Sequence, residues 1–424
     1  MKIHIRFAAL LGAMAIVAMA CGGGGTATTP PASEGAAASS GPATGGLKGE
    51  IALYHSYASS GGGAESAEVQ ALNQIIKMIT DKNPDLKITS TFVTFDQNTI
   101  FTQFEKESAT GGGPDMFIAP NDRLGLEARG GYFADLTGKI DDVLAASSDV
   151  AAGGSKVGDQ VFMVPESLKA VAMYYDKAAV PTPPKSTDEL LTWLQGGGKG
   201  GIIDGAYFGW GFYGAFGGKI FDDTGKCAAT ATSGVADAMK YVESLNQQPS
   251  AIVDSDYNKI NDPFIAKKLD LIFTGNWALG DYKKARGDSL AVAPFVTGPS
   301  GQGKTLVGTD GWYINAAKSP EQQALAIEVA KLLVSAESQQ VMVDVAGHVP
   351  ANKSVTATDP YVKAFTEAIA LGEPRPQSAE FDQYWGPFGD AWSKAVPNDD
   401  KATPGDATAL VATACQTMDK ANNK

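Results

Sequence analysis

The sequence predicts an α/β protein, because helical and strand-like periods alternate along most of its 424 residues. Apolar side chains recur at helical spacing over residues 66–80, and a strand-like run, 87–95, follows once Asn83-Pro84 has ended that helix. Two capping boxes, Ser186–Glu189 and Ser319–Gln322, each open a further amphipathic helix. No repeat of roughly 20 to 50 residues recurs, so we do not expect a solenoid or a propeller.

The bulk composition is that of an acidic globular protein. Hydrophobic residues make up 44% of the chain and charged residues 19%, and the length is sufficient for roughly two or three domains. The formal net charge is −13. A surface of this sign repels phosphate backbones and anionic lipids, so nucleic-acid binding is not expected.

Residues 1–20 are predicted to be a signal peptide. Lys2 and Arg6 supply its positive charge, and the apolar run 7–19 is shorter than the roughly 20 residues that a membrane-spanning helix needs. Two cleavage sites compete. Ala18-Met19-Ala20 fits ordinary secretion, whereas Ala20-Cys21-Gly22 resembles a bacterial lipobox, in which the cysteine is acylated. A cysteine at the first mature position favours lipidation of Cys21.

Residues 21–47 are predicted to form a flexible tether behind that lipidated cysteine. The segment 22–46 consists of Gly, Ala, Ser, Thr and Pro with Glu34 as its one charge, and it cannot bury enough apolar area to fold. We therefore expect an extracytoplasmic protein that its lipid anchors in the membrane. In such an oxidising compartment, Cys227 and Cys415 either pair as a disulfide or remain two buried thiols.

The segment Gly298–Thr305 matches the P-loop pattern of nucleotide-binding proteins at every fixed position. A P-loop requires a helix that begins at its Lys-Thr pair, and residues 306–311, which include two glycines, are a poor helix start. We interpret the segment as a Gly-rich loop without a nucleotide. The three histidines, His4, His55 and His348, show no metal-ligand spacing, so neither a metal nor another cofactor is expected.

Enzymatic activity is not expected, although one alternative stays open. A glycoside hydrolase needs two facing carboxylates, and a pair such as Glu166 and Asp122 could meet in a cleft. Nothing in the sequence singles out such a pair, and no Gly-x-Ser-x-Gly elbow is present. A secreted glycoside-acting lipoprotein is therefore the less favoured hypothesis.

Four tryptophans from Trp210 onward have a glycine within two positions, in contexts that favour loops. Sugar rings present C–H faces and a rim of hydroxyl groups, so their binding sites combine flat aromatic faces with a few polar side chains. For any one tryptophan a core position is an equal alternative, whereas four together favour a carbohydrate site. The segments are 207–213 with Trp210, 275–277 with Trp277, 311–313 with Trp312 and 384–388 with Trp385.

A series of short segments between about Gly49 and the 390s forms an ordered set of motifs, namely 51–57, 113–118, 121–123, 164–167, 173–177, 183–187, 207–210, 275–277, 320–345 and 384–385. Each motif is weak alone, but together and in order they are specific. Through these segments the chain resembles the family of extracellular solute-binding proteins that includes the maltose-binding proteins.

The resemblance implies an α/β, two-lobed fold like that of periplasmic binding proteins, with a central ligand cleft. Three interlobe crossovers are expected near 165–172, 305–311 and 348–356. The N-terminal lobe would comprise 48–167 and 309–350, and the C-terminal lobe 168–308 and 351–424. The implied function is that of a monomer that captures a mono- or oligosaccharide, closes around it and delivers it to the permease of an ABC importer.

The resemblance also implies which residues bind the ligand. Asp122 and Arg123 match a pair that hydrogen-bonds sugar hydroxyls, while Ala119 stands where the maltose-binding pattern has a tryptophan and Lys169 where it has a glutamate. The sugar therefore stays open, and a polyamine is an alternative ligand, against which Lys169 argues. The expected ligand-binding residues are Tyr57, Asp122, Arg123, Lys169, Tyr207, Phe208, Trp210, Asn276, Trp277, Trp312 and Trp385.

Overall fold

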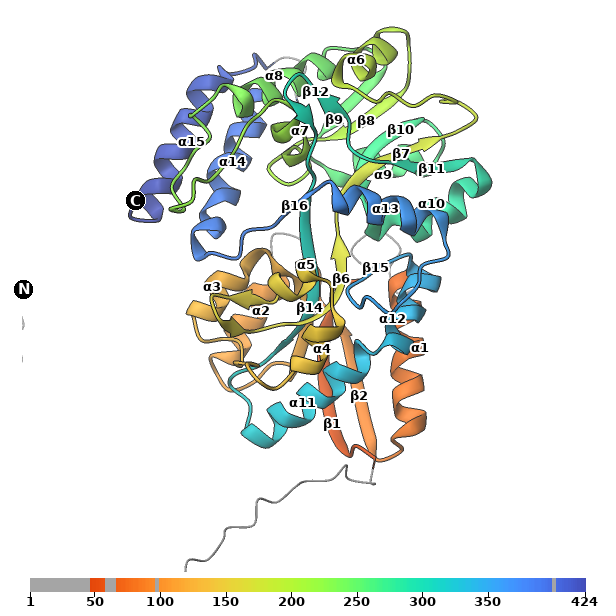
Figure 1. Cartoon of the computed structure of the whole chain (residues 1–424), viewed down its shortest axis with the longest axis vertical. Helices are drawn as coiled ribbons and strands as arrows, with labels where there is room; N and C mark the ends of the chain where they lie inside the picture. Colours follow the sequence, from red (N-terminus) through yellow and green to blue (C-terminus); the bar gives the residue numbers. More distant parts are fainter. Residues whose placement is uncertain (1–45, 58–65, 96–98, 399–401) are drawn as a thin grey trace, which may run out of the picture. The chain divides into compact units, whose positions relative to one another are not determined.

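The computed structural model describes residues 46–57, 66–95, 99–398 and 402–424. The predicted signal peptide, Cys21 and most of the predicted tether lie outside the described residues. Residues Gly46–Lys424 form one compact unit, which is built on two sheets (Figure 1). In the described part of the chain, no helix is long and apolar enough to cross a membrane.

The first sheet forms the centre of the N-terminal lobe. Its strand order is β15-β6-β14-β3-β1-β2, and β16 also pairs with β14. β1 pairs in parallel with β2 and β3, whereas β14 runs antiparallel to β3 and β6. The strands are β1 Gly49–His55, β2 Leu86–Phe92, β3 Met116–Pro120, β6 Val164–Lys169, β14 Leu306–Ile314, β15 Val349–Pro350 and β16 Glu373–Pro374.

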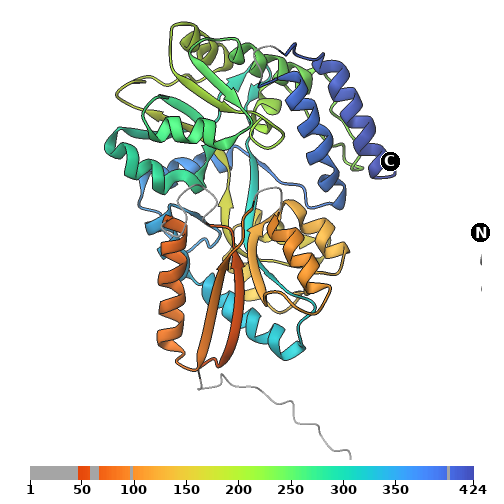
Figure 2. The same cartoon turned by 180° about the vertical axis from the view of Figure 1, so that it is seen from behind.

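Helices cover this sheet, and α1 and α11 pack against each other and against its strands. Seen from behind, α1, β1 and β2 form the near face of the lower lobe (Figure 2). The helices of this lobe are α1 Ala67–Lys82, α2 Thr99–Ser108, α3 Leu124–Arg129, α4 Asp141–Ala146, α5 Asp149–Gly153, α11 Pro320–Leu333 and α12 Ala336–Val341.

The second sheet forms the centre of the C-terminal lobe, in the order β11-β7-β10-β8-β9. Its strands are β7 Val171–Asp176, β8 Gly200–Ile203, β9 Ala251–Asp254, β10 Leu271–Gly275 and β11 Leu290–Ala293. Its helices are α6 Thr187–Gln195, α7 Trp210–Ala215, α8 Gly234–Asn246, α9 Tyr257–Ile265, α10 Leu279–Arg286, α13 Pro360–Ala370, α14 Asp382–Ala395 and α15 Ala407–Ala421.

The chain passes between the two sheets at three places. It leaves β6 for β7 at Ala170, and it returns along β14 after the short hairpin of β12 Thr297–Gly298 and β13 Gly301–Gln302. After β15 it enters α13, which packs against β7 and β11 of the second sheet. The predicted two-lobed α/β class with three crossovers is confirmed.

Serine caps fix the starts of the helices that the sequence predicted. Ser66 Oγ accepts a hydrogen bond from the Val69 amide at 3.3 Å and begins α1. Ser186 and Ser319 cap α6 and α11 in the same way, each at 3.2 Å. Such a cap is worth about 1 kcal/mol, because it gives a partner to an amide at the helix end. These helix starts are confirmed.

The expectation of loops is wrong for three of the four tryptophans, whereas Tyr207 and Phe208 do lie in a turn. Trp210 begins α7, Trp312 lies within β14 and Trp385 lies within α14, while Trp277 sits in the single turn of 3-10 helix η4 Asn276–Ala278. In α14 the buried rings of Tyr384, Phe388 and Trp392 recur every four residues, which is a helical stripe. Packing of this stripe outweighs the loop preference of the Gly-Pro pair inside the helix.

Two further segments take clear structural roles. Cys227 and Cys415 form a disulfide with their Cα atoms 5.3 Å apart, which joins the loop before α8 to α15. The P-loop look-alike forms the β12–β13 hairpin and leads into strand β14, so no helix begins at Lys304-Thr305. Thr305 instead accepts a hydrogen bond from the Val171 amide through Oγ1, at 2.9 Å.

Candidate ligand-binding cleft

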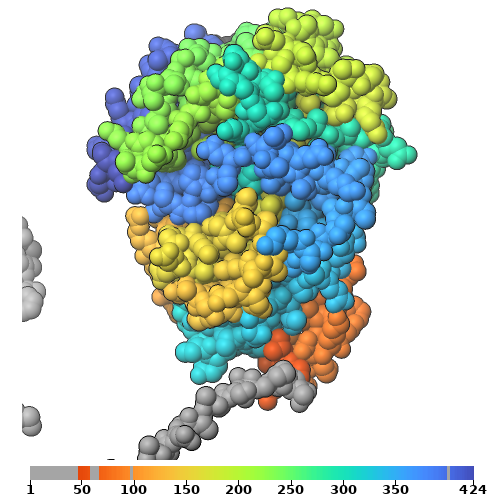
Figure 3. Space-filling model, in the orientation of Figure 1, coloured from red at the N-terminus to blue at the C-terminus, as the bar shows by residue number. Residues whose placement is uncertain are grey.

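A cleft of about 630 Å³ opens between the two lobes and draws its lining from both. A space-filling view shows the segment after β15 crossing the face of the molecule between the lobes (Figure 3). The lining residues are Ser56, Tyr57, Glu68, Phe95, Ile118, Ala119, Pro120, Asp122, Lys169, Tyr207, Phe208, Ser255, Asp256, Tyr257, Asn258, Trp277, Asp310, Arg375 and Trp385.

The C-terminal lobe contributes an aromatic wall, which we define as Tyr207, Phe208, Trp277 and Trp385. The Tyr207 ring lies between the two tryptophans, with its centroid 6.1 Å from that of Trp277 and 6.5 Å from that of Trp385. The Trp277 ring folds back over Gly275, where an added Cβ would lie only 1.9 Å from the ring. Because all four rings are only partly buried, the wall offers free aromatic surface to a ligand.

Asp122 faces this wall from the N-terminal lobe. It sits in the 3-10 turn η3 Asn121–Arg123 directly after β3, and its Oδ1 is buried without a hydrogen-bond partner. Burial raises the pKa of Asp122, although the nearby Arg375 works against that rise. An unpartnered buried acceptor costs free energy that a ligand donor would recover.

Arg375 lies where the polar side of the cleft meets the aromatic wall. Its guanidinium carbon is 5.5 Å from the Tyr207 ring centre and 5.8 Å from that of Trp385, within the range of cation–π contact. One of its nitrogens, Nη1, donates to Asn121 Oδ1 at 3.3 Å, whereas its Nε has no partner. Arg375 directly follows β16. Its hydrogen bond to Asn121 therefore joins the chain after β16 to the turn that carries Asp122.

Arg123, the predicted partner of Asp122, points away from the cleft. Its Nη2 lies 2.8 Å from Glu127 Oε1 and 2.9 Å from Glu105 Oε1, and its guanidinium carbon lies 5.5 Å from the Phe101 ring centre. Adjacent residues in a 3-10 turn project in different directions, so a sequence pair does not ensure a shared site.

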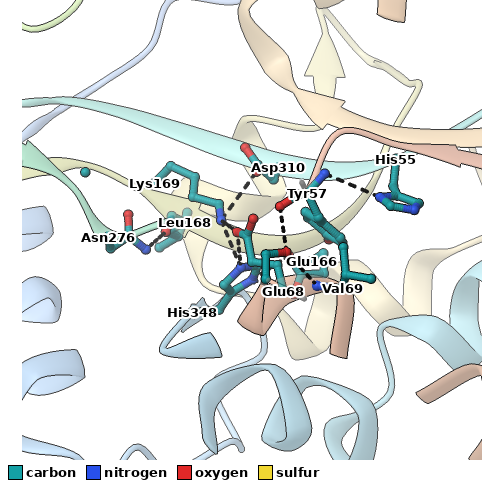
Figure 4. A network of polar contacts seen from close by, with 12 residues as sticks. His55, Tyr57, Glu68, Val69, Glu166, Leu168, Lys169, Asn276, Asp310 and His348 are labelled. Carbon is teal, nitrogen blue, oxygen red and sulfur yellow. Dashed lines mark hydrogen bonds and ion pairs between the residues drawn. The ribbon is translucent and has the colours of Figure 1, made fainter. Parts of the chain in front are cut away.

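Five ionisable side chains meet at the end of the cleft where the chain crosses between the lobes, which we call the hinge side. We call these five residues the hinge cluster: Glu68, Glu166, Lys169, Asp310 and His348 (Figure 4). His348 Nε2 is 2.7 Å from Glu68 Oε1, and its Nδ1 is 3.1 Å from Glu166 Oε1. Lys169 Nζ lies 3.2 Å from Glu68 Oε1 and 3.6 Å from Asp310 Oδ2. These side chains come from α1, β6, β14 and the residue before β15, so the cluster joins elements of all three crossovers.

The cluster sets the protonation of its members. Burial and Lys169 oppose a charge on His348, but Glu166 and Glu68 outweigh them and raise its pKa to about 9. Burial disfavours ionised Glu68 and Glu166, yet the pKa of each is lowered because Lys169 and His348 lie beside them. We therefore treat His348 as an imidazolium that donates from both nitrogens. Glu68 Oε1 then lies between His348 and Lys169, which offsets their 3.0 Å approach.

Asp310 is the exception within the cluster. Burial raises its pKa to about 6, and the 3.6 Å separation from Lys169 is too long for a hydrogen bond. Its second oxygen, Oδ1, is buried without any partner. The hydroxyl of Tyr57, which also lines the cleft, is a further buried group without a hydrogen-bond partner.

Three of the predicted ligand-binding residues are buried structural groups. Asn276 accepts from the Ala170 amide at 3.1 Å and donates to the Leu168 carbonyl at 3.0 Å, so it brackets the first crossover. Trp210 packs edge-on against Tyr384 in the core of the C-terminal lobe, and Trp312 is 1% exposed within the first sheet. Together with Arg123 they do not line the cleft. The predicted residues that do are Tyr57, Asp122, Lys169, Tyr207, Phe208, Trp277 and Trp385.

Three charged lining residues were not among those expected from the sequence: Glu68, Asp310 and Arg375. Glu68 lies in the first turn of α1, where a carboxylate interacts favourably with the helix dipole. That role explains its presence without a ligand, so the sequence does not mark it as a binding residue. Asp310 is the one charged residue of a strand that is buried throughout, which is an unusual place for a charge. Arg375 stands between two prolines and gives no such signal.

Comparisons with known proteins agree with this architecture. The model of the family described as bacterial extracellular solute-binding protein matches residues 74–368. The galactooligosaccharide-binding protein of Bacillus subtilis is 23% identical over 306 residues, which are 66% of this chain and 72% of that protein. A maltooligosaccharide ABC transporter solute-binding lipoprotein of Streptococcus pneumoniae is 24% identical over 332 residues, 72% of this chain and 77% of its own.

A solved structure extends the similarity to the whole body of the protein. The Thermus thermophilus maltotriose-binding protein, bound with maltotriose, matches with a TM-score of 0.75 and 26% identity, covering 88% of this chain and all of that one. The family model alone spans well over half of the sequence, and the two-lobed fold with its interlobe cleft is consistent with it. The chain belongs to the family of bacterial extracellular solute-binding proteins.

Proposed function

We propose that the protein binds an oligosaccharide in the cleft between its lobes and delivers it to the permease of an ABC importer. The observation that carries the proposal is the aromatic wall, in which Tyr207 lies between Trp277 and Trp385 opposite the unpartnered Asp122 Oδ1. Aromatic faces match the C–H faces of sugar rings, and the carboxylate matches their hydroxyl groups. The printed names of the two relatives, galactooligosaccharide- and maltooligosaccharide-binding, support the same class.

The pair of carboxylates that the sequence suggested for hydrolysis does not meet in the cleft. Glu166, the candidate partner of Asp122 for hydrolysis, is held by His348 through contacts of 3.1 and 3.2 Å and does not line the cleft. A hydrolase requires both carboxyl groups to reach the scissile bond. This pair therefore gives no support to a glycoside-acting enzyme, and the family of solute-binding proteins supports binding.

The cellular setting is part of the proposal. We infer a monomer that a lipid on Cys21 anchors outside the cytoplasm, with the Gly-, Ala-, Ser-, Thr- and Pro-rich segment as its tether. The relative from Streptococcus pneumoniae carries the word lipoprotein in its name. Mass spectrometry of protein extracted from membranes should find an acylated Cys21 at the N-terminus. An unmodified cysteine in that position would contradict the anchor.

Calorimetric titration tests the ligand class. Maltotriose and longer maltooligosaccharides, a galactooligosaccharide, putrescine and spermidine should be titrated into the mature protein, with chromatography of the sugars afterwards to detect cleavage. We expect at least one oligosaccharide to bind and to be recovered intact. Binding of the polyamines in preference to every sugar, or the appearance of shorter sugars, would refute the proposal.

The matched variants are Trp277→Ala with Trp385→Ala, against Trp193→Phe as the control. Trp193 lies on α6 outside the cleft lining, partly buried on the core of the C-terminal lobe. The double variant should lose measurable sugar binding while it keeps its circular dichroism spectrum. The control should titrate like the parent.

A further inference from the structure

The hinge cluster contains more carboxylates than cations. Glu68, Glu166 and Asp310 supply three negative charges, while Lys169 and His348 supply two positive ones. Both cations are close to Glu68, and His348 also holds Glu166. Asp310 is therefore the carboxylate with the weakest compensation, since its contact with Lys169 is 3.6 Å long.

Asp310 also has an acceptor without a hydrogen-bond partner. Its Oδ1 is buried and unpartnered, and both Asp310 and Tyr57 line the cleft. The Tyr57 hydroxyl is likewise buried without a partner. A buried acceptor and a buried hydroxyl without partners are costly when no ligand is bound, and a sugar hydroxyl can satisfy both.

The charges that face Asp310 all have fixed signs near neutral pH. Glu68 on α1 and Glu166 on β6 have lowered pKa values, because Lys169 and His348 stabilise their ionised forms against burial. Lys169 on β6 and His348 before β15 stay protonated, since carboxylates raise the pKa of each. A ligand carboxylate at this end of the cleft would meet a buried cluster that already carries a net negative charge.

We propose that Asp310 determines specificity at the hinge end of the cleft: its Oδ1 accepts a hydrogen bond from a ligand hydroxyl, so the site takes sugars that are uncharged there and rejects uronates. Lys169 acts as a positioning residue, held by Glu68 and oriented toward Asp310 Oδ2. This inference rests on the proposed function, because it assigns the ligand class of the same cleft.

The test compares three trisaccharides in titrations at about pH 7.5. Maltotriose is the neutral probe. Each of the other two is a maltotriose in which one terminal hydroxymethyl group is oxidised to a carboxylate, at one end of the sugar in the first acid and at the opposite end in the second. In the parent protein, at least one of the two acids should bind about 100-fold more weakly than maltotriose. Asp310→Asn keeps the shape of the side chain and removes its charge. In this variant the affinity for maltotriose should fall about tenfold, and the ratio of the Kd of that acid to the Kd of maltotriose should also fall about tenfold.

A second measurement uses the parent protein alone and so does not depend on the folding of a variant. Lowering the pH to about 5 protonates Asp310, whose pKa burial raises to about 6, while a uronate stays ionised. The ratio of the Kd values of the acid and of maltotriose should therefore fall. Equal affinity for the acids and maltotriose at about pH 7.5, or a ratio that neither the pH nor Asp310→Asn changes, would overturn the inference while leaving sugar binding intact. If no sugar binds to the parent at any pH, the proposed function fails and this inference fails with it.

Discussion

The two sides of the cleft differ in the kind of interaction that each offers. The aromatic wall presents four partly buried rings that one lobe supplies, whereas the hinge cluster brings together five ionisable groups from elements of all three crossovers. Contact with a ring face is broad and tolerates shifts of a sugar along the wall. A buried charge requires a partner at one position and with one sign.

This difference separates affinity from selectivity. We expect the aromatic wall to supply most of the binding free energy for every acceptable sugar, and the hinge cluster to exclude ligands with the wrong charge. The cluster also belongs to the crossovers, so its loss should affect folding as well as binding. Substitutions on the two sides should consequently change different measured quantities.

The largest effect is expected from His348→Leu, which removes one cation from the hinge cluster. Glu68 and Glu166 would then face each other with a single cation nearby, and breaking a buried ion pair costs about 3 to 5 kcal/mol of stability. Urea denaturation would measure the loss. His55→Leu is the matched control, because burial lowers the pKa of His55 to about 4 and it is buried without charge. Equal losses in both variants would contradict a charged His348.

The pH dependence of stability should show the same charge. His348 has a pKa of about 9 in the folded protein, so it binds a proton there that the unfolded chain loses near pH 6.5. Its contribution is present below about pH 6.5 and is lost as the pH rises toward about 9, on the order of 2 to 3 kcal/mol. The difference in unfolding free energy between the parent and His348→Leu should therefore shrink across that range. If this difference in unfolding free energy does not change with pH, His348 is a neutral imidazole in the folded protein.

On the aromatic side, Trp385→Ala should weaken the binding of all sugars by about 2 kcal/mol, roughly thirtyfold. Trp385 lies half-buried on α14, so stability should change less than it does in His348→Leu. Titration of a panel of neutral oligosaccharides would show their affinities falling together without a change of rank. A change of rank would show that this side also selects.

The smallest effect is expected from Tyr57→Phe. It removes the unpartnered hydroxyl and leaves the ring, so at most one hydrogen bond to the ligand is lost, about 1 kcal/mol or a few-fold in Kd. Titration with maltotriose and its deoxy analogues would identify the sugar hydroxyl involved, since the analogue that lacks it should bind both proteins equally. An unchanged Kd for maltotriose would place the ligand away from the hinge side.

The fold could be predicted from the sequence to a large extent, because its signals are local. The caps at Ser66, Ser186 and Ser319 and the alternation of periods lie within a few residues of the elements they define. The aromatic positions Trp277 and Trp385 were also predictable as cleft residues from the resemblance. Trp312 was not, since a Gly-Trp-Tyr segment fits a loop and a buried strand equally well.

The hinge cluster could not be predicted, because no local pattern connects its members. Glu68 is 280 positions from His348, and Lys169 is 101 positions from Glu68. Only the tertiary fold brings these charges to one place, so a residue such as Asp310, although unusual within its strand, does not reveal its partners. Arg123 shows the opposite error, since its neighbour Asp122 lines the cleft while Arg123 pairs with Glu127 and Glu105.

The disulfide has a consequence for resistance to proteases. Cys227 and Cys415 are 188 positions apart, and the chain between them leaves the C-terminal lobe, forms β14, α11 and α12 of the N-terminal lobe, and returns. The cross-link therefore closes a covalent ring that passes through both lobes. A protease that cuts one bond in this ring opens it without releasing a fragment, and the two pieces separate only after reduction. For a member of an extracellular family, a single cut between Cys227 and Cys415 would thus leave the two pieces of the chain covalently joined.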